Sequence, residues 1–155
     1  MNKNFVMVIP MEAPEIPEPR GSMIEATPGS VDAAKIAKVE LPKGGPRSHL
    51  VVWLVDGKVI RDSLDTDFMG GGHHERYQWI PEGEVWLEAG LDPMDIKFLL
   101  LHELCERAHM INGMEYEEAH ARANQREAWA RQHPQFVEEC IARVLLKNIK
   151  AEKVG

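Results

Sequence analysis

The chain has 155 residues, of which 44% are hydrophobic and 28% are charged, and its formal net charge is −7. These proportions are typical of one globular domain and exclude a wholly disordered chain or a fibrous repeat. The excess of acidic residues argues against broad binding to nucleic acid or anionic lipid, because both attract positive charge. No apolar run approaches the roughly 20 residues of a membrane helix, so we expect no membrane span.

Residues 1–48 are predicted to form an N-terminal strand and a proline-rich arm, ahead of a domain over residues 49–150. Five prolines lie between residues 10 and 31, and proline at this density disfavours helix and central strand alike. We therefore expect little regular structure over residues 11–29. Ser30 is a candidate N-cap for a short helix that continues through Ala37.

A small antiparallel sheet is predicted in the middle of the chain. Residues 50–55 are β-branched and aromatic, and the Asp56-Gly57 pair that follows is typical of a hairpin turn, so we expect residues 50–55 to pair with residues 58–64. Residues 84–88 indicate another strand. His73 and His74 follow three glycines, and we interpret them as part of a surface loop, with a flexible loop that reaches a functional site as the alternative.

Three helices are predicted after the sheet. Asp92 is a suitable N-cap, Pro93 suits the first helical position and Gly113 is a suitable stop, so the first helix should end near residue 112. A second helix is expected from about residue 115 to residue 132, and a third begins at Pro134. The predicted fold class is therefore α+β, a small antiparallel sheet followed by three helices.

The first of these helices carries the side chains with the clearest chemistry. His102 and Glu106 are four residues apart, so they share a helix face and lie near enough to hold one ion. Burying an imidazole and a carboxylate on a largely apolar helix is costly unless they pair or bind a metal. Glu103 points about 100° away, as does the glutamate of an H-E-x-x-H helix, which acts as base on metal-bound water.

The second helix supplies further candidate ligands. A short turn between antiparallel helices brings His120 toward Glu106, and Tyr116, His120 and Glu127 share one face of the second helix. His102, Glu106 and His120 are therefore the candidate ligands, with Glu127 as a substitute ligand or as a carboxylate that supports one. Two imidazoles and one carboxylate are a known ligand set for catalytic zinc, with a position open for water.

Residues 101–107 and 113–120 resemble small zincin-like metallopeptidase-type proteins, many of them phage-encoded or uncharacterised. Residues 80–88 resemble the edge strand that lies along the cleft of a zincin ahead of its active-site helix. The resemblance covers about residues 49–132 and implies a bound Zn²⁺, or another divalent ion, with His102 as the first ligand and Glu103 as the general base. Glu106 stands where zincins usually have their second histidine.

The sequence therefore predicts metal-dependent hydrolysis, with a peptide or protein as the expected substrate. Glu103 would take the proton of the attacking water, and Tyr116 or a histidine at position 73 or 74 would stabilise the oxyanion. Cys105 and Cys140 suggest no disulfide framework, which favours a cytoplasmic setting, or the host cytoplasm for a phage-encoded protein.

Other interpretations stay open. His102 and Glu106 can be a structural pair, with Arg107 bonded to Glu103. The domain can also be a non-catalytic zincin-like binding module, or a phage accessory protein, that keeps a buried polar or metal cluster for its structure. A di-iron carboxylate protein is disfavoured because it needs four long helices and this chain offers three.

Overall fold

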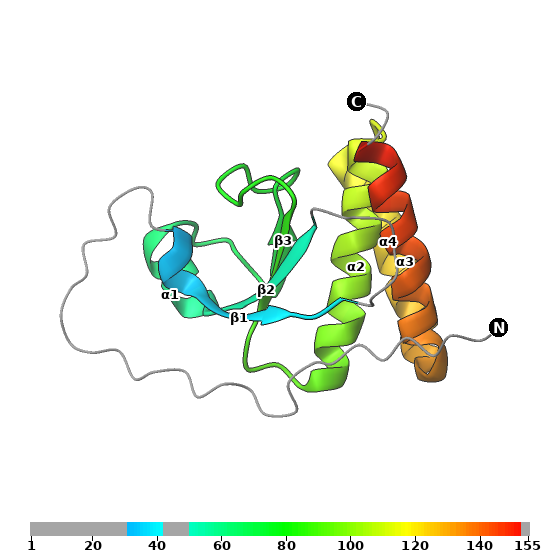
Figure 1. Ribbon diagram of the computed structural model, residues 1–155, viewed down its shortest axis with the longest axis horizontal. Helices are drawn as coiled ribbons and strands as arrows, with labels where there is room; N and C mark the ends of the chain where they lie inside the picture. Colours follow the sequence, from blue (N-terminus) through cyan, green and yellow to red (C-terminus); the bar gives the residue numbers. More distant parts are fainter. Residues whose placement is uncertain (1–30, 42–49, 153–155) are drawn as a thin grey trace.

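The computed structural model describes residues 31–41 and 50–152, so the predicted arm over residues 11–29 lies outside the described part (Figure 1). The α+β class predicted from the sequence is confirmed. In chain order the elements are η1 (Val31–Ala34), β1 (Lys35–Val39), β2 (Val51–Val55), α1 (Gly57–Ser63), β3 (Gly71–His73), β4 (Glu84–Glu88), α2 (Pro93–Ile111), α3 (Tyr116–Gln132), η2 (Pro134–Phe136) and α4 (Val137–Glu152).

The four strands form one mixed sheet in the order β1-β2-β4-β3. β1 is antiparallel to β2, and β3 is antiparallel to β4, but β2 and β4 are parallel, with Val52 opposite Val85. The predicted antiparallel sheet is therefore wrong at its central pairing. Strand β4 has a neighbour on each side, so the expectation that it is an edge strand is also wrong. Among the described strands, β3 lies at the edge of this half of the sheet.

Asp56 begins a helix and does not turn a hairpin. Its carboxylate accepts hydrogen bonds from the backbone N–H groups of Lys58 at 3.0 Å and Val59 at 3.3 Å, which makes it the N-cap of α1. The predicted pairing of residues 50–55 with residues 58–64 is wrong, although β2 itself lies where it was predicted. Aspartate favours both turns and helix starts, and here the full burial of Ile60 from α1 stabilises the helix.

The short helix predicted through Ala37 ends early: Val31–Ala34 form the 3-10 helix η1, and strand β1 replaces the rest. Its residues pair with β2, with Lys38 opposite Trp53 and Val39 opposite Val52. A partner strand outweighs a weak local preference for helix, because the ladder satisfies the backbone groups and Val39 becomes buried.

The first two helices after β4 confirm the predicted bounds, whereas the residues from Pro134 form the short 3-10 helix η2 and α4 begins only at Val137. The carboxylate of Asp92 accepts a hydrogen bond from the N–H of Met94 at 2.9 Å, Pro93 occupies the first position of α2, and Gly113 follows the helix with φ 95°. Among the described residues, no helix has both the length and the apolar character needed to cross a membrane.

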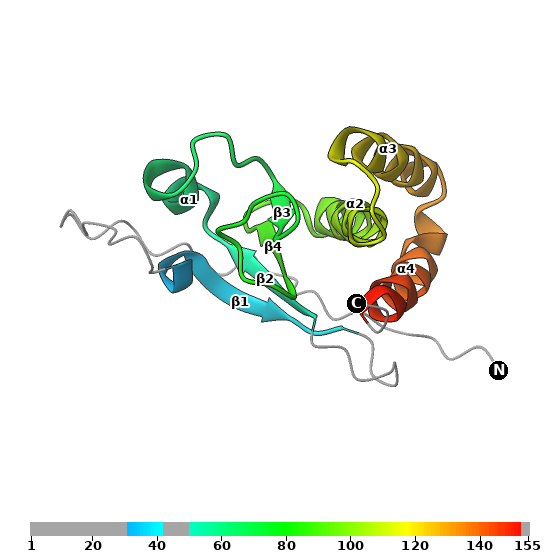
Figure 2. The same ribbon diagram turned by 90° about the horizontal axis from the view of Figure 1, so that it is seen from above.

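Helix α2 occupies the centre of the molecule. One side of it packs against β3 and β4, and the other side packs against α3 and α4 (Figures 1 and 2). Leu100, Leu101 and Leu104 are fully buried in the core between these layers. A helix enclosed on both sides is usually apolar all round, but α2 buries four polar side chains: His102, Glu103, Glu106 and Arg107.

Candidate metal centre

His102 and Glu106 lie on successive turns of α2, facing the junction of the sheet and α3. They are 5% and 2% exposed, and Nε2 of His102 lies 3.3 Å from Oε2 of Glu106. The predicted pairing of these two side chains is confirmed. Buried polar atoms need hydrogen-bond, ion-pair or metal partners. The groups around Glu106 therefore show how its burial is compensated.

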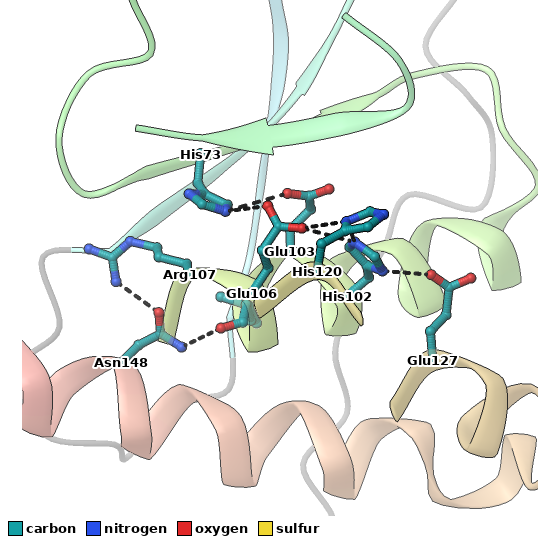
Figure 3. A network of polar contacts seen from close by, with 9 residues as sticks. His73, His102, Glu103, Glu106, Arg107, His120, Glu127 and Asn148 are labelled. Carbon is teal, nitrogen blue, oxygen red and sulfur yellow. Dashed lines mark hydrogen bonds and ion pairs between the residues drawn. The ribbon is translucent and has the colours of Figure 1, made fainter. Parts of the chain in front are cut away.

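Helix α3 brings a second imidazole to the same carboxylate oxygen. Nδ1 of His120 lies 2.8 Å from Oε2 of Glu106 and 3.2 Å from Nε2 of His102. Ala119 and Ala123 on α3 are fully buried, and their small side chains let α3 approach α2 closely. The structure therefore brings together three of the predicted ligands, His102, Glu106 and His120 (Figure 3).

The three facing atoms form a triangle with edges of 2.8, 3.2 and 3.3 Å. Zinc bonds of about 2.0–2.2 Å to nitrogen and oxygen at tetrahedral angles place neighbouring ligand atoms roughly 3.3 Å apart. Once deprotonated, the two imidazole nitrogens and the carboxylate oxygen can all direct a lone pair toward one cation. The donor set and its spacing fit a divalent cation such as Zn²⁺.

Glu127 stands behind His102, on the side away from this triangle. Its Oε1 lies 3.1 Å from Nδ1 of His102, close enough for an ion pair although not aligned as a hydrogen bond. Its other oxygen accepts a hydrogen bond from Nε of Arg131 at 2.8 Å. A carboxylate behind a ligating imidazole favours the tautomer whose Nε2 lone pair faces the metal. Of the two predicted roles for Glu127, these contacts favour support of His102.

His73 belongs to the cluster, which the predicted surface loop excluded and which only the alternative, a loop that reaches a functional site, allowed. It is fully buried on β3, and its Nε2 lies 2.9 Å from Oε1 of Glu106, so the interpretation as a surface loop is wrong. The glycines before His73 are the sequence feature from which its inward position could have been predicted. A Cβ on Gly71 would lie 3.2 Å from Cγ of Glu103, so glycine lets β3 lie close against α2 and carry His73 inward.

Glu103 is a buried carboxyl group with few polar contacts. It is 6% exposed, and its one ion-pair contact among the described residues is with Nε2 of His73, at 4.0 Å. Burial, followed by the charge of Glu106, raises the pKa of Glu103 to about 8. The alternative that pairs Arg107 with Glu103 is not supported, since Arg107 donates to Oδ1 of Asn148 at 2.8 Å.

Glu106 and His102 have pKa values shifted in opposite directions. Burial opposes ionisation of Glu106, but hydrogen bonds from His102, His73 and His120 hold its pKa well below its usual range. Burial also opposes protonation of His102, yet the carboxylates of Glu106 and Glu127 raise its pKa to about 10. Without a metal, the cluster is therefore held together by a protonated His102 beside ionised carboxylates, and a metal has to replace that proton.

The cluster opens to solvent beside His120, whose side chain is 41% exposed. Tyr116, one turn earlier on α3, tilts its ring against that of His120 with centroids 5.3 Å apart. The guanidinium of Arg76 lies 4.2 Å from the centroid of the Tyr116 ring. Tyr116 thus borders the open side of the cluster, and its role toward an oxyanion stays a prediction.

The metal-free protein is expected to lose stability as the pH rises from about 6.5 toward 10. His102 releases its proton near pH 6.5 when unfolded but keeps it to about pH 10 when folded. Its contribution is therefore complete below pH 6.5 and is lost as the pH passes through the folded value. Chemical denaturation in the presence of a chelator, at several pH values between 6 and 9.5, measures this slope.

The control for this pH series is His133→Gln, since His133 follows α3 at its C-terminal end, outside the ligand triangle, and the variant should leave the slope unchanged. His102→Gln should reduce the slope, leaving the part that comes from Glu103, whose pKa is raised to about 8 in the folded protein. Added Zn²⁺ should raise the Tm by more at pH 8 than at pH 6, because the metal competes with the proton of His102. A parent protein whose stability stays level or rises over this range would contradict the expected charge state.

Comparisons of the chain with protein-family models, with curated proteins and with solved structures found no match.

Proposed function

We propose that the protein is a metal-dependent hydrolase that holds one catalytic divalent ion, most simply Zn²⁺, through His102, Glu106 and His120. The observation that carries this proposal is the convergence of three ligand atoms, 2.8–3.3 Å apart, beside the buried carboxyl group of Glu103. Two imidazole nitrogens and one carboxylate oxygen suit zinc, and three protein ligands leave a fourth position for water or substrate.

A divalent ion in this position would lower the pKa of a water molecule and polarise the carbonyl group of a substrate. Glu127 and Glu103 would have different roles in the reaction. Glu127 orients His102 from behind, and Glu103 takes the proton of the attacking water and returns it to the leaving group. A pKa of about 8 for Glu103 lies close to neutral pH, which suits a group that both accepts and donates a proton.

The proposed substrate is a peptide or protein, on the strength of the zincin resemblance of residues 101–107 and 113–120. Access is proposed from the side of His120 and Tyr116, where the cluster meets solvent. Cys105 and Cys140 are both free thiols, which agrees with a proposed cytoplasmic location.

The test begins with the metal content of the purified full-length chain. Elemental analysis is expected to find zinc, iron or manganese at no less than one ion per chain, and adding Zn²⁺ to chelator-treated protein should raise its Tm. The reconstituted protein should then cleave members of a fluorogenic peptide library, and chelator should stop the cleavage. Absence of both bound metal and a thermal shift would favour the non-catalytic binding module instead.

A further inference from the structure

The polar cluster contains a second group of ligand atoms, which the proposed function does not use to hold metal. Nε2 of His73 and one carboxylate oxygen each of Glu103 and Glu106 all lie within 4.8 Å of one another. All three side chains are buried. This group joins β3 to α2, whereas the first group joins α2 to α3 (Figure 3).

Glu106 belongs to both groups and presents a different oxygen to each. Oε1 faces His73 at 2.9 Å, while Oε2 faces His120 at 2.8 Å and His102 at 3.3 Å. Figure 3 shows the Glu106 carboxylate between His73 on one side and the other two imidazoles on the opposite side. A carboxylate in this arrangement can bridge two cations, and two-metal sites in proteins hold their ions about 3.5–4 Å apart.

Glu103 provides the independent observation that points to a ligand. Among the described residues its carboxyl group has no hydrogen bond that would offset its burial, and its nearest ion-pair partner is Nε2 of His73 at 4.0 Å. A buried carboxyl group without a hydrogen-bond donor is costly. The separation of 4.0 Å is too long for a hydrogen bond and wider than the roughly 3.3 Å between neighbouring ligands of a tetrahedral ion, so a cation between the two atoms would draw the carboxyl group of Glu103 toward His73.

We propose that His73, Glu103 and Oε1 of Glu106 form a second divalent-cation site, joined to the first through Glu106, and that filling this site withdraws Glu103 from its role as base. The second part of this inference rests on the proposed function, but the existence of the site does not. One imidazole and two carboxylates suit Zn²⁺ and also harder ions such as Mn²⁺. The second ion binds more weakly because a dication already occupies the other side of Glu106.

The experiment counts the bound ions of the full-length chain. Protein treated with chelator is dialysed against increasing free Zn²⁺, and bound zinc is measured by elemental analysis at each concentration. We expect two steps of one ion each, with hydrolysis appearing at the first step and falling at the second. A second titration with Mn²⁺, followed by electron paramagnetic resonance, should reveal magnetic coupling between two neighbouring ions.

His73→Asn is expected to abolish the second step and the inhibition by excess zinc, while the first ion still binds. The matched control is His74→Asn, because His74 is the next residue and belongs to neither group, its Nδ1 being hydrogen-bonded to the carbonyl oxygen of Ile80 at 2.7 Å. This control should still bind two ions. Should His73→Asn fail to fold, Glu103→Gln provides a second test, since it too should bind one ion.

The outcomes separate this inference from the proposed function. One ion per parent chain, with hydrolysis undiminished by excess zinc, overturns the second site and leaves the proposed function standing. No bound ion overturns both. Two ions in the parent and still two in both His73→Asn and Glu103→Gln place the second ion elsewhere and overturn the inference. If the parent binds two ions and hydrolysis does not fall at the second step, the second ion does not withdraw Glu103 from its role as base, and that part of the inference is overturned.

Discussion

Glu103→Gln is expected to abolish hydrolysis while the fold and the first bound ion are retained. The amide cannot accept the proton of the attacking water, and loss of a general base costs about 10²–10⁴ in kcat. The fold should tolerate the change because burial raises the pKa of Glu103 to about 8, so in the metal-free protein at pH 7 the side chain is mostly a neutral carboxyl group. Glutamine has nearly the same shape and is also neutral.

Three measurements on the Glu103→Gln protein separate catalysis from structure: the Tm, the amount of zinc bound in the first step, and the rate of peptide cleavage. Glu117→Gln is the matched control, because Glu117 lies exposed in the first turn of α3 and should leave all three unchanged. A Glu103→Gln protein that cleaves peptides as fast as the parent would remove Glu103 from the mechanism. One that loses the first ion would make Glu103 a primary ligand.

His102→Ala is expected to lose the first metal ion and, with it, much of the stability of the loaded protein. The free energy of metal binding is part of the free energy of folding, so the Tm should no longer respond to Zn²⁺. The metal-free protein should also be destabilised, by about 3–5 kcal/mol, because removing one partner of a buried pair leaves the carboxylate of Glu106 less well compensated.

A graded comparison distinguishes ligands from supporting residues. His120→Ala should lose the ion as completely as His102→Ala but cost less metal-free stability, because the side chain of His120 is far more exposed. Glu127→Ala should weaken zinc binding only about 10–100-fold, since it contacts the opposite nitrogen of His102. Competition with a chelator of known affinity measures each value. Unchanged zinc affinity in all three variants would make the cluster a structural polar patch.

The parts of the site that could be predicted are those set by local rules. The spacing of His102 and Glu106 places them on one helix face whatever the helix packs against. The bounds of α2 follow from Asp92, Pro93 and Gly113, because capping acts within one turn of the chain. The return of His120 to Glu106 needed only a short turn and small side chains between the two helices. The sequence by itself therefore determined the three helices and the first ligand group.

Long-range packing decided the pairing of the strands, the start of α1 and the position of His73. Asp56-Gly57 is compatible with a hairpin and with a helix start, and the buried position of Ile60 selects the helix. His73 reaches Glu106 because the order β1-β2-β4-β3 puts β3 beside α2, and strand order depends on contacts between residues far apart in sequence. The same is true of the parallel pairing of β2 with β4. Only the tertiary structure could therefore bring His73 and Glu103 together, since no periodicity links a residue on a strand with one on a helix thirty positions later.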